Sequence, residues 1–210
     1  MTLNQLTGIN LAKILTVLLL LGYALIYGIS DLRQVIYLSL HISYCLWWLV
    51  EQWFFPPRSE QIFQEKITIV ELILILLVVG VFYSLPGYLA FRNPLGISYL
   101  SVAIALPVYI FGSLINAVAD TQKLIAKEMG AGLVKDNIWR FSRNINYFGD
   151  LGRYLSFCII SGSWWSYILP LSIAILYYQR IKQKEATMTE KYPDYPEYQE
   201  KSANLIPYIW

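Results

Sequence analysis

The chain has 210 residues, of which 57% are hydrophobic and 14% are charged, and its formal net charge is +2. This length suits one domain or a compact membrane bundle, and such an apolar composition is unusual for a soluble protein. The small net charge without a Lys/Arg-rich run argues against a nucleic-acid partner, and two cysteines with one histidine and no CxxC spacing argue against a disulfide framework or a metal site.

The first 119 residues contain four apolar runs, each long enough to cross a bilayer as a helix. These predicted spans are residues 9–29, 34–55, 67–88 and 97–118. Pro56-Pro57 ends the second run, whose last third carries the aromatic residues typical of a membrane interface. Pro107 lies inside the fourth run and is expected to kink it. The first run has neither a positive n-region nor a cleavage site, which indicates a retained transmembrane helix rather than a signal peptide.

Polarity changes after residue 120. The stretch 120–147 carries five Lys/Arg residues and two glycines, which predicts a helical continuation, a glycine turn and a short further segment. Two apolar segments follow, 151–161 and 164–178, each shorter than the roughly 20 residues of a full span. Joined by Gly162-Ser163, they predict a helical hairpin that enters the membrane and returns. A charged amphipathic helix over 179–190 and a tail over 191–210 complete the chain.

The predicted fold is therefore an all-α, multi-pass transmembrane helix bundle. It has four full spans in residues 1–119, followed by a C-terminal membrane hairpin and a tail in residues 120–210, all within one integrated membrane domain. Most Lys and Arg residues lie after residue 120, so the C-terminal third is expected to face the cytoplasm. The lipid bilayer is the one partner that these patterns identify, and the oligomeric state is left open.

One stretch, residues 142–150, concentrates polar groups: it reads Ser-Arg-Asn-Ile-Asn-Tyr-Phe-Gly-Asp. Arg143 offers a planar fork of donors suited to phosphate or carboxylate, and Asn146 can donate and accept. Tyr147 offers a ring and a hydroxyl, and Asp150 stands where a carboxylate favours a helix start. Such residues could form the floor of a cofactor site. They could equally form an interfacial loop in which Arg and Asp pair with their neighbours.

This stretch resembles the S-R-H-P-N-Y-x-G-(D/E) signature of the superfamily that joins steroid 5-alpha-reductases, C14-sterol reductases and isoprenylcysteine carboxyl methyltransferases. Asp120-Thr121-Gln122-Lys123 resembles the (D/N)-x-Q-K that precedes the signature in the reductases, and residues 184–208 resemble the sterol-reductase ending E-A…K-Y…W…Y…P-Y. The three blocks cover residues 120–210, and uncharacterised 5-alpha-reductase-like membrane proteins look most similar. The first 119 residues match only as hydrophobic spans.

Three residues at two sites depart from the superfamily pattern. The His-Pro of the signature is Asn144-Ile145 in this chain, and in the methyltransferases that histidine touches S-adenosylmethionine. The paired glutamates of the methyltransferases appear as Lys184-Glu185, with Arg180 upstream in the expected place. The missing histidine weakens the methyltransferase interpretation. The Gln122-Lys123 pair, with Asn146 and Asp150, leans toward the NADPH-dependent reductases, and S-adenosylmethionine is the alternative cofactor. A non-catalytic membrane protein of the same fold is a third hypothesis.

The resemblance implies a nicotinamide cofactor in a pocket formed by the last helices. Gln122 and Lys123 would face its phosphates, and Arg140 is a candidate for the 2′-phosphate by charge alone. The residues that would line or close the site are Arg143, Asn146, Tyr147, Asp150, Glu185 and Tyr198. No GxGxxG motif follows a strand, so a Rossmann site is not expected.

Reduction of a C=C or enone bond in a hydrophobic, steroid- or isoprenoid-like substrate also needs a proton donor. The methyltransferase alternative would instead modify a lipid or a prenylated carboxylate. Ionisable groups within spans are candidates because they are costly in a membrane. His41 and Glu71 are weak catalytic candidates on this ground, and Tyr147 of the polar stretch is a third weak candidate. Each also has a structural interpretation: a hydrogen-bonded interior histidine, a glutamate paired with Lys66 or a neighbouring helix, and an interfacial tyrosine.

Overall fold

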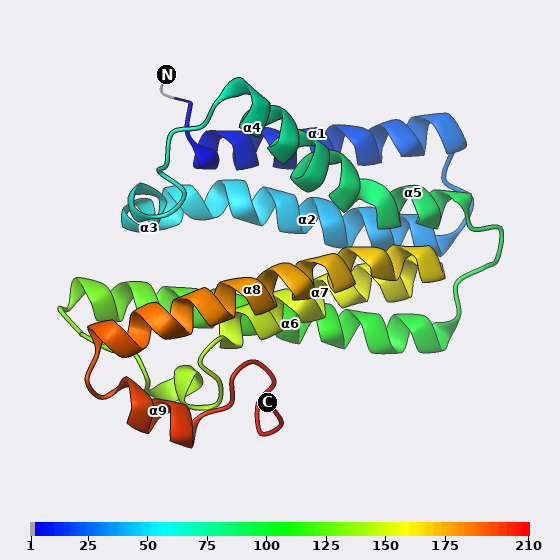
Figure 1. Ribbon diagram of the computed structural model, residues 1–210. Helices are drawn as coiled ribbons and strands as arrows, with labels where there is room; N and C mark the ends of the chain where they lie inside the picture. The colour runs from blue at the N-terminus through cyan, green and yellow to red at the C-terminus, as the bar shows by residue number, and fades with distance from the viewer. Residues whose placement is uncertain (1–2) are drawn as a thin grey trace. The chain divides into compact units, whose positions relative to one another are not determined.

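The computed structural model of the protein describes residues 3–210 as helices and connecting loops, with no strand in that range (Figure 1). The chain divides into two compact units. The first contains residues up to Ala103 together with Phe157–Leu169, and the second contains Ile104–Ser156 and Pro170–Trp210. The all-helical class is confirmed for the described residues. The predicted division after residue 119 stays a prediction.

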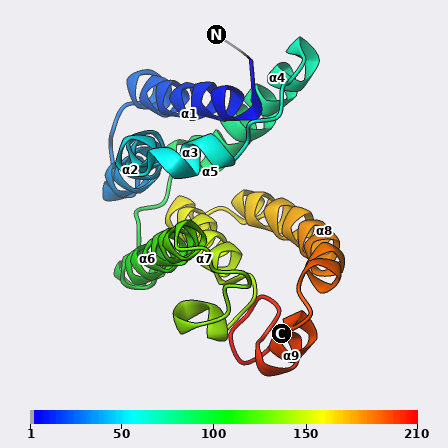
Figure 2. The same cartoon turned by 90° about the vertical axis from the view of Figure 1, so that its left-hand side faces the viewer.

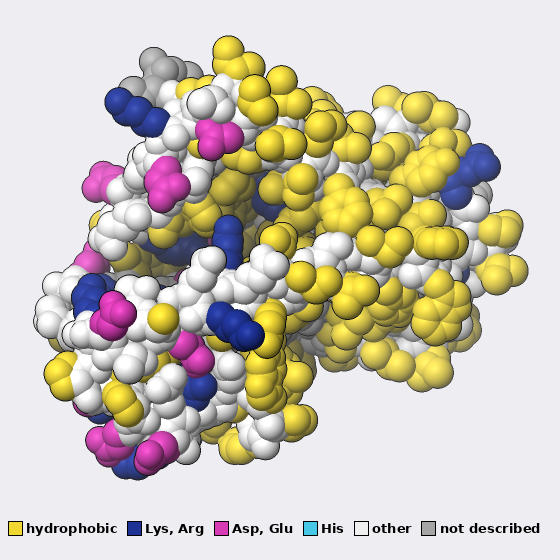
Figure 3. All heavy atoms as spheres, in the orientation of Figure 1, with side chains coloured by type: hydrophobic (Ala, Val, Ile, Leu, Met, Phe, Trp, Pro, Cys, Tyr) yellow, Lys and Arg dark blue, Asp and Glu magenta, His cyan; other side chains and the backbone are white. Residues whose placement is uncertain are grey.

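The first unit is built mainly from two long helices and an interrupted third. Its elements are α1 (Gln5–Tyr27), α2 (Leu32–Phe54), α3 (Pro56–Gln61), α4 (Ile69–Ile75), η1 (Leu76–Val81), η2 (Phe82–Ser84), α5 (Leu85–Arg92) and η4 (Trp164–Tyr167). Asn4 caps α1, and Asp31 with Gln34 forms a capping box on α2, so both helices begin where a side chain satisfies their first N–H groups. Hydrophobic side chains cover the outer face of α4 (Figure 3).

Polar contacts join the helices of this unit across its apolar interior. The buried Lys13 ammonium donates to the Tyr44 hydroxyl at 2.9 Å and lies 4.1 Å from the centre of its ring. Trp48 donates its indole N–H to the Asn10 side chain at 2.9 Å, again between α1 and α2. Such bonds satisfy polar groups that would otherwise be costly in an apolar environment.

The third helical segment is interrupted where the sequence predicts a continuous span over 67–88. Residues 76–81 form a π-helix and residues 82–84 a 3₁₀ turn before α5 begins. Pro86 lies in the first turn of α5, where its missing N–H costs no hydrogen bond. The π-helix and the 3₁₀ turn both precede this proline, and the helical segment still extends from Ile69 to Arg92.

The second unit contains the remaining helical elements. They are α6 (Tyr99–Glu128), η3 (Asn137–Arg140), α7 (Ile145–Ser161), α8 (Ile168–Lys191) and α9 (Tyr195–Lys201), of which α6, α7 and α8 also contribute residues to the first unit. Gly130 has a φ of 80°, which confirms the predicted glycine turn after α6. The tail that follows α9 lies between α9 and the loop carrying η3 (Figure 2). Charged side chains gather around α9 and the end of α8 (Figure 3).

Two glycines bring α6 and α7 into backbone contact. A Cβ added to Gly112 would lie 2.6 Å from the carbonyl oxygen of Gly149, and a Cβ on Gly149 would lie 2.6 Å from that of Gly112. Only glycine fits at either position without a backbone shift, as is common where membrane helices cross closely. This crossing fixes the start of α7, and with it residues 145–150 of the polar stretch.

Three helical segments within residues 3–210 are long and apolar enough to span a membrane: α1, the segment from Ile69 to Arg92, and α6. They support an integral membrane protein. The predicted second span corresponds to α2, whose 23 residues include several polar side chains, and it stays a prediction. The predicted hairpin segments are parts of longer helices, because Lys, Glu and Gln residues after Tyr178 favour helix and extend α8 to Lys191.

Candidate functional site

A cavity of ≈ 300 Å³ lies in the second unit between α6, α8, α9 and the loop that carries η3. Its volume is at the lower end of the roughly 300–1,000 Å³ typical of ligand pockets. Five of its lining side chains are cationic, four are aromatic, and the rest are Leu133, Val134 and Met188. The cations are Lys123, Lys127, Arg143, Lys184 and Lys191, and the aromatic residues are Trp139, Tyr192, Tyr195 and Tyr198.

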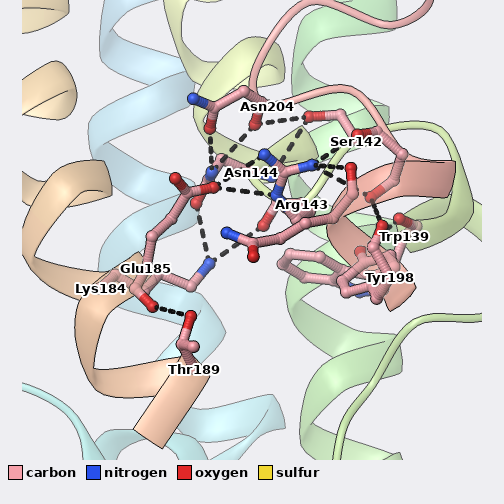
Figure 4. A network of polar contacts seen from close by, with 11 residues as sticks. Trp139, Ser142, Arg143, Asn144, Lys184, Glu185, Thr189, Tyr198 and Asn204 are labelled. Carbon is pink, nitrogen blue, oxygen red and sulfur yellow. Dashed lines mark hydrogen bonds and ion pairs between the residues drawn. The ribbon is translucent and has the colours of Figure 1, made fainter. Parts of the chain in front are cut away.

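Arg143 ties the tail to α8 beside this cavity. Its Nε and Nη2 atoms lie 2.9 Å and 2.8 Å from the Glu185 carboxylate, and its Nη1 donates to the carbonyl oxygens of Gln199 and Ser202 at 3.0 and 2.5 Å (Figure 4). The guanidinium is almost fully buried. Most of its donors are therefore used within the protein, so Arg143 shapes the wall of the cavity and offers little to a ligand directly.

Asn144 and Lys184 form the next contact (Figure 4). Lys184 Nζ donates to the Asn144 side-chain oxygen at 2.8 Å and to the Arg143 carbonyl at 3.0 Å. The fully buried Asn144 donates in turn to the backbone oxygen of Asn204 at 2.9 Å. Burial, followed by the positive charge of Lys123, lowers the pKa of Lys184 to about 7. The Lys184 amine therefore changes charge near neutral pH.

The lysines of the cavity have mainly neutral acceptors. Lys127 donates to the Tyr192 hydroxyl at 3.0 Å and to the carbonyl oxygens of Ala131 and Gly132. Lys123 and Lys184 lie 5.5 and 5.7 Å from the centre of the Trp139 ring. Within the cavity lining only Arg143 forms an ion pair that the structure records. Asp120 and Glu185 act on Lys184 from outside the lining and oppose the lowering of its pKa. The lining itself has cations and no carboxylate, which favours an anionic ligand.

Trp139 forms a rigid aromatic wall of the cavity. Its indole N–H donates to the Ala119 carbonyl at 3.1 Å, and the Tyr198 hydroxyl donates to its backbone oxygen at 2.5 Å. The ring packs in a buried cluster with Ala119 and Ile145. Burial raises the pKa of Tyr198, so its hydroxyl stays protonated and remains a donor at neutral pH. Trp139 is only 3% exposed, so it gives the cavity a fixed wall and the two lysines an aromatic partner.

A second polar group lies between α7 and α8, further along both helices. The Tyr147 and Tyr177 rings stack with centroids 4.1 Å apart, and the Tyr177 hydroxyl donates to the Asp150 carboxylate. Arg153 lies 3.3 Å from the other oxygen of Asp150. Since α7 and α8 run antiparallel here, the contacts Asn144–Lys184 and Asp150–Tyr177 are successive steps along one helix pair.

The remaining predicted site residues lie around these two groups. Gln122 donates to the Asp136 carbonyl at 3.1 Å, which holds the loop before η3. Asn146 donates to Asp120 at 3.2 Å, while its own carbonyl accepts from Asn116. Arg140 is exposed, with its guanidinium 4.7 Å from the Phe141 ring centre, and it does not line the cavity.

The catalytic candidates of the first unit have structural partners. His41 is fully buried, stacks on Phe157 at 4.4 Å and shares a 2.9 Å hydrogen bond between its Nδ1 and the Tyr37 hydroxyl. Glu71 accepts from the backbone N–H and hydroxyl of Thr68 at 2.7 and 2.9 Å. Thr68 and Glu71 form a capping box at the start of α4. The structural role of Glu71 is therefore that of a helix cap, whereas the sequence predicts pairing with Lys66 or a neighbouring helix.

A separate apolar cavity of ≈ 250 Å³ lies along α6 and α7 in the second unit. No charged or hydrogen-bonding side chain lines it. Gly112 and Gly152 provide the hollow, and the walls are Pro107, Val108, Phe111, Ile115 and Phe148. Such a cavity suits a hydrocarbon group rather than a polar one.

Several residues around the candidate site were not selected from the sequence. They are Lys127, Trp139, Tyr177, Lys184, Lys191, Tyr192 and Tyr195. The spacing of the lysines is a usable signal: Lys123 and Lys127 are four residues apart, and Lys184 and Lys191 are seven apart, so each pair shares one helix face. Trp139 has no such signal, because its place in the cavity depends on the loop between α6 and α7.

A family model described as "Protein of unknown function (DUF1295)" matches residues 16–203. The chain belongs to this family. The match covers both units and the whole of the candidate site, apart from the end of the tail. A comparison with curated proteins finds no match.

Proposed function

We propose that this DUF1295 protein is an integral-membrane reductase that uses NADPH. The proposal rests mainly on the cavity, whose lining has five cationic side chains and no carboxylate. A rigid tryptophan is among its aromatic walls. Phosphate groups favour such a cluster of lysines, and an adenine ring could stack on Tyr192, the aromatic lining residue that is not buried. The cavity volume suits the phosphate-bearing half of the dinucleotide.

The same charge distribution argues against the alternative cofactor. S-adenosylmethionine carries a sulfonium and an ammonium group, so it needs carboxylate or aromatic partners for positive charge. Glu185 could supply a carboxylate, but Arg143 already binds it at 2.8 Å. Lys184 occupies the position of one of the paired glutamates of the methyltransferases. A cavity with this charge therefore favours an anionic cofactor over a cationic one.

The order of contacts along α7 and α8 suggests how the cofactor would lie. With phosphates near Lys123 and Lys184, the nicotinamide end would extend toward Tyr147 and Asp150. NADPH would supply hydride there, and the chain's own groups would orient the ring and move a proton. The Tyr177 hydroxyl, which donates to Asp150, is positioned by that carboxylate and by the stacked Tyr147 ring.

A hydrophobic substrate fits the surroundings of this site. The apolar cavity along α6 and α7 shares Phe148 and Gly152 with the helix that carries Tyr147 and Asp150. We infer that an isoprenoid- or steroid-like group reaches the site from the bilayer and carries the C=C or enone bond that is reduced. The resemblance of residues 120–210 to the steroid 5-alpha-reductase superfamily agrees with this reaction class.

The proposal is tested by titrating the detergent-purified protein with NADPH and following the fluorescence of the bound nicotinamide. Lys123→Gln is expected to weaken binding about 10- to 100-fold, the equivalent of roughly 1.5–3 kcal/mol for a hydrogen bond to a charged group. The matched control is Lys135→Gln, because Lys135 pairs with Asp194 at 2.8 Å and does not line the cavity.

If Lys123→Gln binds NADPH as tightly as the unchanged protein does, the cavity is not the NADPH site. A loss of affinity in both variants to the same degree would indicate long-range electrostatics rather than a phosphate site. Saturable binding of S-adenosylmethionine, with no response to NADPH, would replace the reductase by a methyltransferase.

A further inference from the structure

The last residues of the tail, 206–210, form a closed turn that we call the tip. The amide N–H of Trp210 donates to the Ile206 carbonyl at 3.1 Å, and the carbonyl of Trp210 accepts from Leu205 and Ile206 at 2.6 Å each. The turn directs apolar side chains outward: Tyr208 is 86% exposed and Ile209 is 80% exposed. This is a costly surface to leave in water.

The base of the tip is fixed, so its exposure does not come from a loose end. Leu205 is buried, and Asn204 accepts from both Ser142 and Asn144 at 3.1 and 2.9 Å. The amide of Arg143 donates to the Ala203 carbonyl at 2.9 Å. The chain therefore holds the apolar tip in one place.

The tip continues an apolar surface of α8. The Trp210 ring stacks on Tyr178 with centroids 6.0 Å apart. Tyr178 is the last residue of the apolar half of α8, because Gln179 and Arg180 follow it. On the preceding turns of the same helix, Leu171, Ile175 and Leu176 are exposed hydrophobic residues. Trp210 thus lies at the boundary between the apolar and the charged half of the helix.

Cations flank this boundary. Lys182 Nζ lies 4.6 Å from the centre of the Tyr178 ring, and the Arg140 guanidinium lies 4.7 Å from that of Phe141. Phe141 in turn contacts the Tyr208 ring at 5.8 Å. Aromatic rings with Lys and Arg beside them are the usual composition of a protein surface at lipid headgroups, where the rings and the cations both find partners.

We propose that the tip is a membrane-interface anchor that inserts Tyr208, Ile209 and Trp210 among phospholipid headgroups. The anchor holds the tail, and with it α9, whose Tyr195 and Tyr198 line the basic cavity. The bilayer and the tail are coupled through the backbone contacts of residues 203 and 204. This interaction is independent of which cofactor the cavity binds.

The test places an environment-sensitive fluorophore on Ile209→Cys in the full chain, reconstituted in phosphatidylcholine vesicles with and without phosphatidylglycerol. Cys45 and Cys158 are fully buried, and each is replaced by alanine so that only the new thiol is labelled. The control is Lys201→Cys on α9, whose native side chain is 70% exposed. Nitroxide lipids labelled near the headgroup are then added as quenchers.

The expected result is a blue-shifted emission at position 209 that loses more than half its intensity to the nitroxide lipids, while position 201 is quenched only by aqueous iodide. Equal quenching of both positions by iodide, with no effect of the lipids, would overturn the proposal. As a second measurement, Ile209→Asp should speed trypsin cleavage after Lys201 in vesicles, and an unchanged rate would overturn the coupling to the tail. Neither measurement requires NADPH. A failure of the anchor proposal can therefore be told apart from a failure of the reductase proposal.

Discussion

The ammonium group of Lys184 donates a 2.8 Å hydrogen bond to the side-chain oxygen of Asn144. Asn144 stands where the resembled signature has histidine, and Lys184 stands where the methyltransferases have one of two glutamates. The two sites at which the chain departs from the resembled pattern are therefore in direct contact with each other. In this chain the contact places the Lys184 amine in the cavity lining and joins the residue before α7 to α8.

Ligand affinity should depend on pH through Lys184. Because its pKa is lowered to about 7, the amine is charged below that value and neutral above it. A phosphate ligand prefers the charged form, so NADPH affinity is expected to fall as the pH rises from about 6 to about 8. The variant Lys184→Arg stays charged, because arginine is not deprotonated in proteins, and should show little change over this range. Parallel pH profiles in the two proteins would contradict this role.

Lys184 should also make the stability of the fold depend on pH, in the direction opposite to that of NADPH affinity. Its pKa is about 7 in the folded protein and near the ordinary 10.5 when unfolded, so the unfolded chain binds more protons between these values. The free energy of unfolding should therefore rise with pH across this range by a contribution that Lys184→Met lacks. Thermal unfolding of both proteins over the same pH series measures the difference, and a constant difference would be inconsistent with a lowered pKa.

Removal of Arg143 should loosen the tail rather than simply remove a ligand contact. The guanidinium binds Glu185 and two tail carbonyls in a buried setting, so Arg143→Met is expected to cost roughly 3–5 kcal/mol of stability, as when one partner of a buried pair is lost. Limited proteolysis should then cut the tail faster. The exposed Arg140 is the control, and Arg140→Met should change stability by less than about 0.5 kcal/mol. Similar stability in both variants would refute the assigned contacts.

The glycine crossing of α6 and α7 should tolerate no side chain. Gly149→Ala places a methyl group 2.6 Å from the Gly112 carbonyl oxygen and 2.8 Å from the Asn116 amide nitrogen. Overpacking of this kind costs roughly 1–3 kcal/mol, and backbone contacts cannot rotate away. Gly22→Ala is the matched control within α1, since nothing lies within 4 Å of its added Cβ. Thermal unfolding should separate the two variants, and equal midpoints would argue against the close approach.

Glu71 should act as a helix cap and not as a proton donor. Glu71→Ala is expected to lower the melting temperature and leave NADPH affinity unchanged, because the capping box with Thr68 is lost. Glutamine also serves at this position of a capping box, so Glu71→Gln should restore most of the stability. A Glu71 variant with an unchanged melting temperature and no catalytic activity would instead support a catalytic role for Glu71.

The long helices of the first half could be predicted from the sequence, because a long apolar run has few stable structures other than a helix. The run predicted at 9–29 is α1, Gln5–Tyr27, and the run at 97–118 lies within α6. The π-helix at Leu76–Val81 was not expected, since no residue in it differs in polarity from its neighbours. The glycine turn at Gly130 was predicted, because a positive φ is readily adopted by glycine.

The candidate site could be predicted only in part. Lys123, Arg143 and Tyr198 do lie around one cavity, and the resemblance located them. The sequence predicts that the polar stretch forms the floor of one site. In the structure, Arg143 and Asn144 contact the tail, whereas Tyr147 and Asp150 contact Tyr177 on α8. Residues before and within a helix face different neighbours, and those neighbours come from segments distant in sequence. The pairing of Arg143 with Glu185 likewise depends on how α8 packs.

Thermal unfolding of the detergent-purified protein, run in parallel with NADPH, NADH and S-adenosylmethionine, tests the central claim most directly. A ligand at 100 times its dissociation constant should stabilise the fold by about 2.7 kcal/mol. The account predicts a higher midpoint with NADPH, a smaller effect with NADH, which lacks the 2′-phosphate, and none with S-adenosylmethionine. A shift with S-adenosylmethionine alone, or with none of the three ligands, would contradict it.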